Sequence, residues 1–311
     1  MTFERFSEKF LQGLKESGLE VETLETQKVN ETLTAIRIKD KTELIQPTLY
    51  LERLHKAFES GVNMEQLVRD TAYTLTHANI NIEDIPELNR DTAQQRLFCT
   101  VINKDLNTEL IANVPHQDML DLSLIARFRV FEHASILVNN DICGELKLTS
   151  EEVMQIAKEN TFAEQYKCVP MSDMLKEYLL QDGMPPEFIS DVMKIRQEEC
   201  PMYVLTNNNG VNGATMMVSK NVLDSIYEEF EDNFYILPSS LHEVILIPES
   251  FSDDVEMYRD MVVDVNGSFL EAEDKLSDNV YHYDGITRSL TIAGQSKMED
   301  VCAVKSPVKG R

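Results

Sequence analysis

Two short runs of the sequence hold side chains of the types that serve in acid-base and nucleophilic catalysis. The first run holds His116 and Asp118, and the second holds Ser239 and His242. Nucleophilic catalysis needs a hydroxyl or thiol within hydrogen-bond reach of a base, and histidine is the commonest base. Catalytic groups are brought together by the fold rather than by adjacency in sequence. A local cap or turn is therefore the simpler interpretation of both runs, and a catalytic site is the alternative.

Motifs for metals and nucleotides are missing. The pair His242-Glu243 is followed by Leu246 at the position where a zinc protease motif has its second histidine, and no Cys-x-x-Cys occurs. The sequence has no Gly-Lys-Ser or Gly-Lys-Thr and no G-x-G-x-x-G. The asparagine and glycine run 207–213 tolerates positive φ, which a hairpin loop explains. We therefore predict no bound metal and no cofactor.

Acidic residues dominate the charge of the chain. Its 311 residues include 29 Lys and Arg against 54 Asp and Glu, a net charge of −25, which disfavours binding to generic DNA or RNA. Residues 221–300 alone hold 19 acidic and 4 basic residues. We expect an exposed interaction face there for a basic protein partner, and a merely solvated surface is the alternative. This acidic face comprises Asp253, Asp254, Glu256, Asp260, Glu271, Glu273 and Asp274.

The sequence shows no sign of export or membrane insertion. Residues 1–30 have no uninterrupted apolar region, and no stretch approaches the roughly 18 apolar residues of a membrane span. The five cysteines are odd in number and widely spaced, which is typical of free thiols in a reducing compartment. We expect a cytoplasmic protein that does not bind membranes.

The first ninety residues predict elements in the order α-β-β-α-α. Apolar residues recur at steps of three and four from Phe3 to Leu14, which predicts a helix. Apolar alternation on both sides of residues 28–32 predicts a β-hairpin. Helical patterns then follow on both sides of Gly61.

Two later segments share one pattern. Residues 135–170 and residues 202–238 each predict two strands, a helix and a strand that ends at a proline, and Thr149 and Glu152 are spaced as a capping box. A diverged duplication of a β-β-α-β unit is one interpretation, and chance resemblance of two generic segments is the other.

Two hairpins are predicted in these later segments. The first joins strands at 97–102 and 110–114. The second runs from Tyr203 to Val218 and turns within residues 207–213, where the chain has its best turn residues. Residues 122–131 predict a further strand, which could pair with 136–138.

These patterns together predict an α+β fold with helices packed around a shared antiparallel sheet. We predict an αββαα subdomain over 1–90, a first α+β unit over 91–200 and a second over 201–296. Residues 297–311 lose periodicity and carry Lys and Arg, which predicts a flexible tail.

Four runs of residues resemble a known bacterial family. They are Asn113–Leu122, Met202–Asn207, Tyr235–Ile245 and Leu276–Tyr283, and they are similar to domain of unknown function 5688. The Val-Pro-His and Thr-Ser-Glu-Glu segments are more distantly similar to domain of unknown function 1444. The resemblance spans residues 3–293 and implies an intracellular bacterial protein. It carries over no activity and no site residues.

The function most consistent with this sequence is that of a non-enzymatic binding or accessory protein with an acidic interaction face. The alternative is an enzyme of unknown reaction with a polar site near His116 or His242. A concave pocket where these polar groups converge would favour the enzyme.

Overall fold

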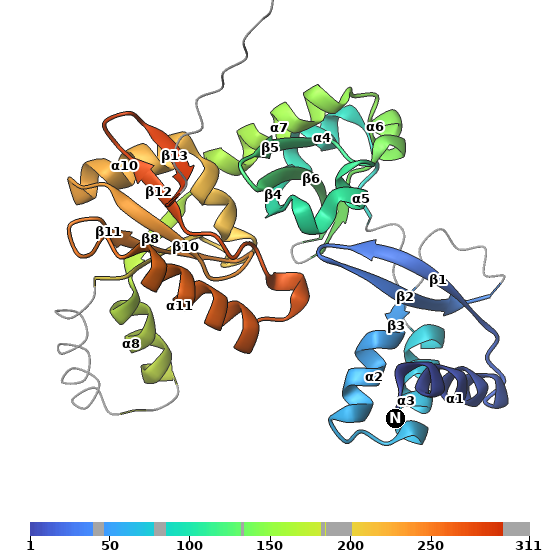
Figure 1. Cartoon of the computed structure of the whole chain (residues 1–311). Helices are drawn as coiled ribbons and strands as arrows, with labels where there is room; N and C mark the ends of the chain where they lie inside the picture. The colour runs from blue at the N-terminus through green and yellow to red at the C-terminus, as the bar shows by residue number, and fades with distance from the viewer. Residues whose placement is uncertain (40–46, 78–84, 132–133, 182–183, 185–200, 295–311) are drawn as a thin grey trace, which may run out of the picture.

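The fold is that of a computed structural model, which describes residues 1–39, 47–77, 85–131, 134–181, 184 and 201–294. The described residues form three antiparallel sheets with helices packed against them, which confirms the predicted α+β class. Figure 1 shows the sheets in three successive parts of the chain. The predicted tail over 297–311 lies outside the described residues.

The N-terminal module comprises the described residues up to His77. Its elements are α1 (Phe3–Glu16), β1 (Val21–Lys28), β2 (Glu31–Ile38), β3 (Leu49–Tyr50), α2 (Leu51–Glu59) and α3 (Met64–His77). The predicted order is present, with the two-residue β3 added beside β2. Phe6, Phe10 and Leu14 are fully buried, as the helical spacing predicts. Asn30 makes the β1–β2 turn in the left-handed region, which asparagine tolerates.

The middle module is built around the long strand β6. Its elements are α4 (Arg90–Arg96), β4 (Leu97–Asn103), η2 (Asp105–Asn107), α5 (Thr108–Ile111), β5 (His116–Met119), β6 (Leu122–Phe131), β7 (Ala134–Leu137), α6 (Asn140–Leu146) and α7 (Ser150–Ala163). Strand β4 pairs with one edge of β6, while β5 and β7 pair with the other. Thr149 and Glu152 form the predicted capping box of α7.

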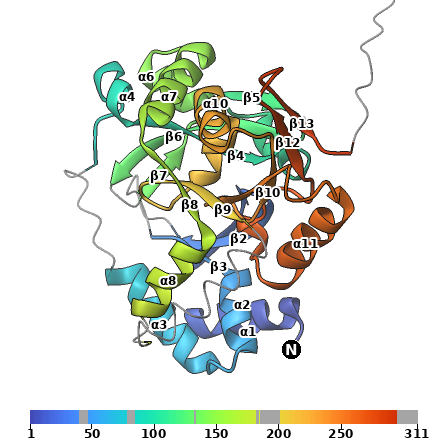
Figure 2. The ribbon, with the colours of Figure 1, turned by 90° about the vertical axis from the view of Figure 1, so that its left-hand side faces the viewer.

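The C-terminal module contains a six-stranded sheet of order β13-β12-β10-β11-β9-β8. Its elements are β8 (Tyr166–Pro170), α8 (Met171–Gln181), β9 (Tyr203–Asn207), η3 (Gly213–Val218), α10 (Lys220–Phe230), β10 (Phe234–Pro238), β11 (Val244–Pro248), α11 (Val255–Ser268), η4 (Ala272–Asp274), β12 (Tyr281–Asp284) and β13 (Ser289–Ile292). Helix α10 covers one face of this sheet, and α8 and α11 lie on the other (Figures 1 and 2).

The middle and C-terminal modules share one hydrophobic core but not one sheet. Phe128 of β6 belongs to the same buried cluster as Leu205 of β9 and Phe234 of β10. Side chains cover the free edge of β4. The main-chain N–H of Cys99 donates to Thr161 Oγ1 of α7 at 2.8 Å, and that of Val101 donates to Thr215 Oγ1 of η3 at 3.1 Å. The prediction of one shared sheet is therefore wrong, since a helix and a 3-10 turn complete the edge where further strands were expected.

Both predicted hairpins are wrong in their second strands. Residues 110–114 lie in and after α5, where Leu110, Ile111 and Val114 pack on Ile125 of β6. Residues 213–218 form η3, and each of them is buried. The strand prediction assumes that alternate residues are buried on one face only. Residues 213–218 are buried on all sides, so this assumption does not hold for them. Strand β9 instead pairs with β8 and β11.

The strand pairing contradicts the proposed duplication. Residues 135–170 form strand, helix, helix and strand, and residues 202–238 form strand, 3-10 helix, helix and strand. The β-β-α-β description is therefore wrong in its second element. In the first segment β7 lies in the four-stranded sheet and β8 in the six-stranded sheet, whereas β9 and β10 lie in the same sheet. Strand β8 thus pairs with the unit that we predicted to start at residue 201.

Candidate functional site

An apolar groove lies between α8 and α11 on one face of the six-stranded sheet. Its volume is about 520 Å³. Its floor is formed by β9, β10 and β11, and its walls are formed by the two helices. The lining residues are Met171, Met174, Leu175, Met202, Val204, Leu237, Pro238, Ser239, Glu243, Ile245, Met261, Val262 and Val265.

Strand alternation provides the floor of the apolar groove. In β10, Phe234 and Ile236 belong to the core under α10, while Tyr235 and Leu237 belong to the cluster under α11. Tyr258 of α11 is fully buried against this second face. The helix covers one part of the face, and the part between α8 and α11 stays open to solvent as the groove.

Four of the lining residues are methionines. Met174 on α8 and Met261 on α11 are each 37% exposed, so a ligand can reach them from solvent. Met171 and Met202 are half-buried deeper in the lining. Methionine is unbranched and polarizable, and surfaces rich in it adapt to apolar ligands of different shapes. The lining therefore suits an apolar segment of variable sequence.

The elements that form the apolar groove carry an excess of acidic side chains, which we call its acidic rim. Glu243 lines the groove itself. Exposed carboxylates lie on the two wall helices outside the lining, at Asp173 and Glu177 of α8 and at Asp260 and Asp264 of α11. Against them stand one lysine on α8 and one arginine on α11, and that arginine is already bonded to a glutamate of its own helix at 2.6 Å. The net negative rim attracts cationic groups.

The predicted acidic face divides into two groups. Six of its seven carboxylates are exposed, and Asp274 is half-buried. The first group lies at the start of α11, where Asp254 caps the helix through the N–H of Met257 at 3.0 Å. Asp253 and Asp260 belong to this group and point to no basic side chain among the described ion pairs. This first group lies on or just before α11, the helix that forms one wall of the groove.

The second group is paired within the chain. On η4 and just before it, Glu271 binds Lys56 and Glu273 binds Arg53, the latter pair at 2.8 Å. Lys56 donates a hydrogen bond to Glu271 and so holds the pKa of that carboxyl below its ordinary value. Both cations come from α2 of the N-terminal module. Local charge counting missed these partners because they lie more than two hundred residues away in sequence.

His242 links two loops. Its Nδ1 accepts a hydrogen bond from the main-chain N–H of Asn212 at 3.1 Å, and its Nε2 lies 3.4 Å from Asp274. The hydroxyl of Ser240 accepts from the main-chain N–H of His242 at 2.9 Å, which is the predicted local cap. Ser239 lines the apolar groove. The ring thus connects the loop after β9 to η4, and both of its nitrogens are engaged.

His116 and Asp118 lie on β5, at an edge of the four-stranded sheet. His116 Nδ1 is 3.0 Å from the carbonyl of Val114, which is a local turn contact. Asp118 pairs with Lys104 Nζ at 2.7 Å and accepts from Ser123 Oγ at 3.0 Å. The hydrogen bond from Lys104 lowers the pKa of Asp118. The first candidate catalytic run therefore lies on and beside β5 of the four-stranded sheet, and the second lies in the loop between β10 and β11 of the six-stranded sheet.

Asp121 is a structural residue that sequence analysis missed. Its carboxylate accepts hydrogen bonds from Ser277 Oγ at 2.7 Å, Asn279 Nδ2 at 2.9 Å and Tyr281 OH at 2.8 Å. These contacts join the runs 113–122 and 276–283, two of the four that carry the family resemblance. No local signal identifies this role, because the partners lie 156 or more residues away.

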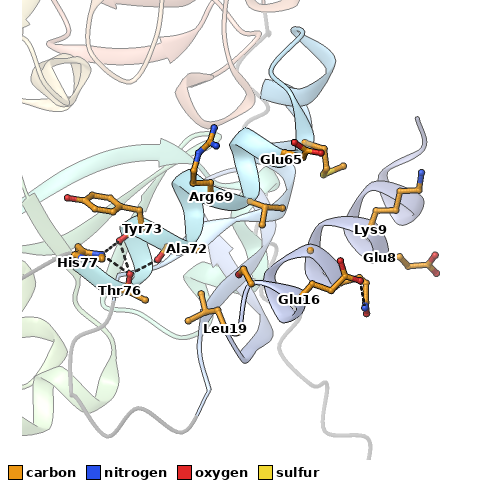
Figure 3. A pocket seen from close by; sticks show the side chains of 16 residues that line it. Glu8, Lys9, Glu16, Leu19, Glu65, Arg69, Ala72, Tyr73, Thr76 and His77 are labelled. Carbon is orange, nitrogen blue, oxygen red and sulfur yellow. Dashed lines mark hydrogen bonds between the residues drawn. The ribbon is translucent and has the colours of Figure 1, made fainter.

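A second groove lies between α1 and α3 of the N-terminal module, with a volume of about 1010 Å³ (Figure 3). At its floor Gly13 of α1 allows the helices to approach closely, since a Cβ there would lie 2.9 Å from Val68. Tyr73 and His77 stack on its α3 wall with ring centroids 4.2 Å apart. Its walls carry Glu, Lys and Arg together, so it does not favour one sign of charge.

The described part of the chain contains neither a metal-binding cluster nor a reactive thiol. No group of three or more His, Cys, Asp or Glu there could hold a metal ion. Cys99, Cys143 and Cys168 are free, as predicted for the cysteines that the structure describes. Burial raises the pKa of Cys99 to about 11 and that of Cys168 to about 12, so both are neutral thiols at pH 7. None of the described helices has the length and apolar character of a membrane span.

Comparison with known proteins identifies the family of the chain. The comparisons with curated proteins and with solved structures found no match. The model of a family described as "Family of unknown function (DUF5688)" matches residues 2–285, nearly the whole chain. The resemblance to this family is therefore confirmed, whereas no similarity to domain of unknown function 1444 is shown. This chain belongs to the family of unknown function DUF5688.

Proposed function

We propose that this protein is a non-enzymatic binding protein whose apolar groove holds a basic amphipathic segment of a partner protein. The observation that carries the proposal is the combination of a methionine-rich lining with an acidic rim. An amphipathic helix laid in a groove presents apolar anchors on one face and charged residues on the other. Here the anchors would be apolar and the flanking charges basic.

The apolar lining supplies the affinity in this proposal. Met174, Met261 and Val265 are exposed on the walls, while Leu237 and Val204 are buried in the floor. Covering an exposed apolar side chain contributes on the order of 1.5–3 kcal/mol when its burial is complete. Two or three anchors of the partner would therefore provide micromolar binding after the entropy of association is subtracted.

The acidic rim supplies the choice of partner. Asp173, Glu177, Asp260 and Asp264 stand on the wall helices, and the first group of the acidic face continues beyond them. Complementary charge accelerates association and suppresses partners of the wrong sign. An acidic amphipathic segment would contact the same apolar floor but would be repelled by the rim, and a neutral segment would gain no attraction from it.

The alternative function, an enzyme with a site near His116 or His242, has less support. Both ring nitrogens of His242 are engaged by Asn212 and Asp274, and the neighbouring Ser240 hydroxyl bonds to the main chain. A nucleophile and its base need a mutual hydrogen bond, and none is formed between these groups.

A synthetic peptide of about 18 residues, with Leu at helical spacing and Lys between, tests the proposal by fluorescence anisotropy. Val265→Glu places a charge in the groove, and we expect it to weaken binding by about tenfold or more. Val263→Glu is the matched control, because Val263 is exposed on the same helix but does not line the groove. Both variants add the same charge, so only the apolar contact differs.

A separate experiment tests the contribution of charge to peptide binding. Reversing Asp253, Glu256 and Asp260 to Lys should weaken the Leu/Lys peptide, and the difference should shrink as salt is raised. A Leu/Glu peptide of the same pattern should bind less tightly than the Leu/Lys peptide. Equal binding by the Val265→Glu and Val263→Glu proteins, or no preference between the two peptides, would overturn the proposal.

A further inference from the structure

A third cavity, more polar than the apolar groove, lies where the four-stranded sheet meets the loop after β9. Its volume is about 350 Å³. One wall comes from β4, β6, β7 and the end of α7, and another comes from the asparagine-rich loop. The lining residues of this polar cavity are Phe98, Cys99, Arg129, Ala134, Ser135, Thr161, Glu164, Asn207, Asn209, Val211 and Asn212.

Three arginines gather beside the polar cavity, in a chain with a net charge of −25. Arg127 and Arg129 are two residues apart on β6 and therefore point to the same face of the sheet. Arg96 lies next to them, since its Nη1 donates to the carbonyl of Arg129 at 3.2 Å. Such a local excess of guanidinium groups contrasts with the acidic surface elsewhere.

Arg129 lines the cavity with donors to spare. Its guanidinium lies over the ring of Phe98, with Cζ 4.9 Å from the centroid, which is a cation-π contact. Its only ion pair among the described residues is with Glu164, at a long 3.4 Å. A guanidinium has five N–H donors, so one long contact leaves most of them for a further acceptor.

Arg127 supports the cavity from behind Ser135. Its Nε donates to Ser135 Oγ at 2.9 Å, so the hydroxyl proton of Ser135 can be donated to a ligand. No carboxylate pairs with Arg127 in the part of the chain that the structure describes. Burial of its guanidinium lowers its pKa. A cation placed in this way is stabilised by an anion nearby.

Apart from Glu164, the remaining lining groups do not oppose an anion. Cys99 is a neutral thiol, and the Thr161 hydroxyl is engaged with the N–H of Cys99 at 2.8 Å. Asn209 and Asn212 add amide groups, which can donate. Glu164 is the one acidic residue in the lining. Its carboxylate competes with any ligand for Arg129.

We propose that the polar cavity binds a small molecule through a phosphate or carboxylate group held by Arg129, with Ser135 and the loop asparagines as further donors. Planar guanidinium groups match both kinds of oxyanion. A volume of about 350 Å³ lies within the range of small-molecule sites, so the ligand is a small metabolite rather than a polymer. The site is separate from the apolar groove and does not depend on its function.

Titration with inorganic phosphate, followed by ³¹P NMR and calorimetry, tests the site in the full chain. Arg129→Gln should weaken phosphate binding by about tenfold or more. Glu164→Gln should strengthen it several-fold, because it removes a competing and repelling carboxylate. Arg37→Gln is the control, because it also removes one ion-paired arginine, here an exposed one on β2. It should leave binding unchanged.

A second arm replaces phosphate by malonate, which separates a phosphate site from a carboxylate site. Arg129→Lys keeps the charge but loses the planar fork, so it should retain more phosphate binding than malonate binding. Thermal unfolding without anion checks that each variant is folded. Equal binding of both anions by the wild-type and Arg129→Gln proteins, or weaker binding by Glu164→Gln, would overturn the proposal.

Discussion

The carboxylate of Asp121 joins the middle module to the end of the C-terminal module through three hydrogen bonds. We predict that Asp121→Asn lowers the free energy of unfolding by about 3 kcal/mol, because an amide group turns a donor toward groups that themselves donate. Urea unfolding measures the change. Asp105→Asn, an exposed aspartate with no described hydrogen bond, is the control and should cost less than about 0.5 kcal/mol. A loss no larger than that of the control would contradict the role of Asp121.

Asp224 makes the stability depend on pH. Its ordinary pKa is 3.8, and the hydrogen bond from Tyr283, with Arg288 at 2.7 Å, holds its pKa below that value in the folded state. The unfolded chain therefore binds the proton more readily. The resulting stability is present above about pH 4 and is lost as the pH falls toward the lower, folded pKa.

We predict that Asp224→Asn destabilises the protein near neutral pH and flattens the decline in stability below about pH 4. Urea unfolding at several pH values measures this. The same Asp105→Asn variant serves as control and should keep the wild-type slope. A wild-type slope in the Asp224→Asn protein would show that this carboxyl is not responsible.

At the scale of elements, η3 shows how a packed environment selects a conformation. A Cβ on Gly213 would lie 2.6 Å from the main-chain nitrogen of Asn207 and 2.6 Å from the carbonyl oxygen of His242. We predict that Gly213→Ala costs more than about 2 kcal/mol, because main-chain atoms must move. Differential scanning calorimetry measures it.

Gly144 provides the matched comparison for this prediction. It lies in α6, no neighbouring atom is within 4 Å of the place where a methyl group would be added, and its φ is not positive. Gly144→Ala should therefore raise stability by about 0.5–1 kcal/mol through helix propensity. Similar effects of the two substitutions, of either sign, would contradict the close packing around η3.

At the scale of the whole molecule, the N-terminal module is held to the C-terminal module by a few polar contacts. Lys56 and Arg53 of α2 bind Glu271 and Glu273. Asn30 at the β1–β2 turn donates to two carbonyls of residues 272–275, and its N–H bonds to the side chain of a residue in η2 at 2.7 Å. Exposed ion pairs of this kind contribute little each and are screened by salt. The second group of the acidic face thus has a basic partner in the same chain.

We predict that reversing Arg53 and Lys56 to Glu loosens this contact and speeds hydrogen exchange at the Asn30 amide. Raising the salt concentration should speed exchange in the wild-type protein but little in the double variant. Adding Glu271→Lys and Glu273→Lys restores opposite charges and should restore protection. Failure of this charge swap to slow exchange would show that the ion pairs do not hold the module.

The sequence by itself determined the features that depend on near neighbours along the chain. The helix from Phe3 to Glu16, the β1–β2 hairpin and the capping box of α7 follow from periodicity and from residues three or four apart, and they are present as predicted. The periodicity of apolar residues involves only near neighbours, so the helix or strand that it predicts does not depend on how distant segments pack. The family assignment likewise follows from runs of adjacent residues.

Only the tertiary structure decided which distant segments meet. The apolar residues within 213–218 are as consistent with a strand as with a buried 3-10 helix. The surrounding core selects the helix. The partners of Asp121, the α2 cations that pair with Glu271 and Glu273, and the helices that leave the apolar groove open all lie far apart in sequence. Their pairing depends on geometry and burial, which no local pattern of residue types encodes.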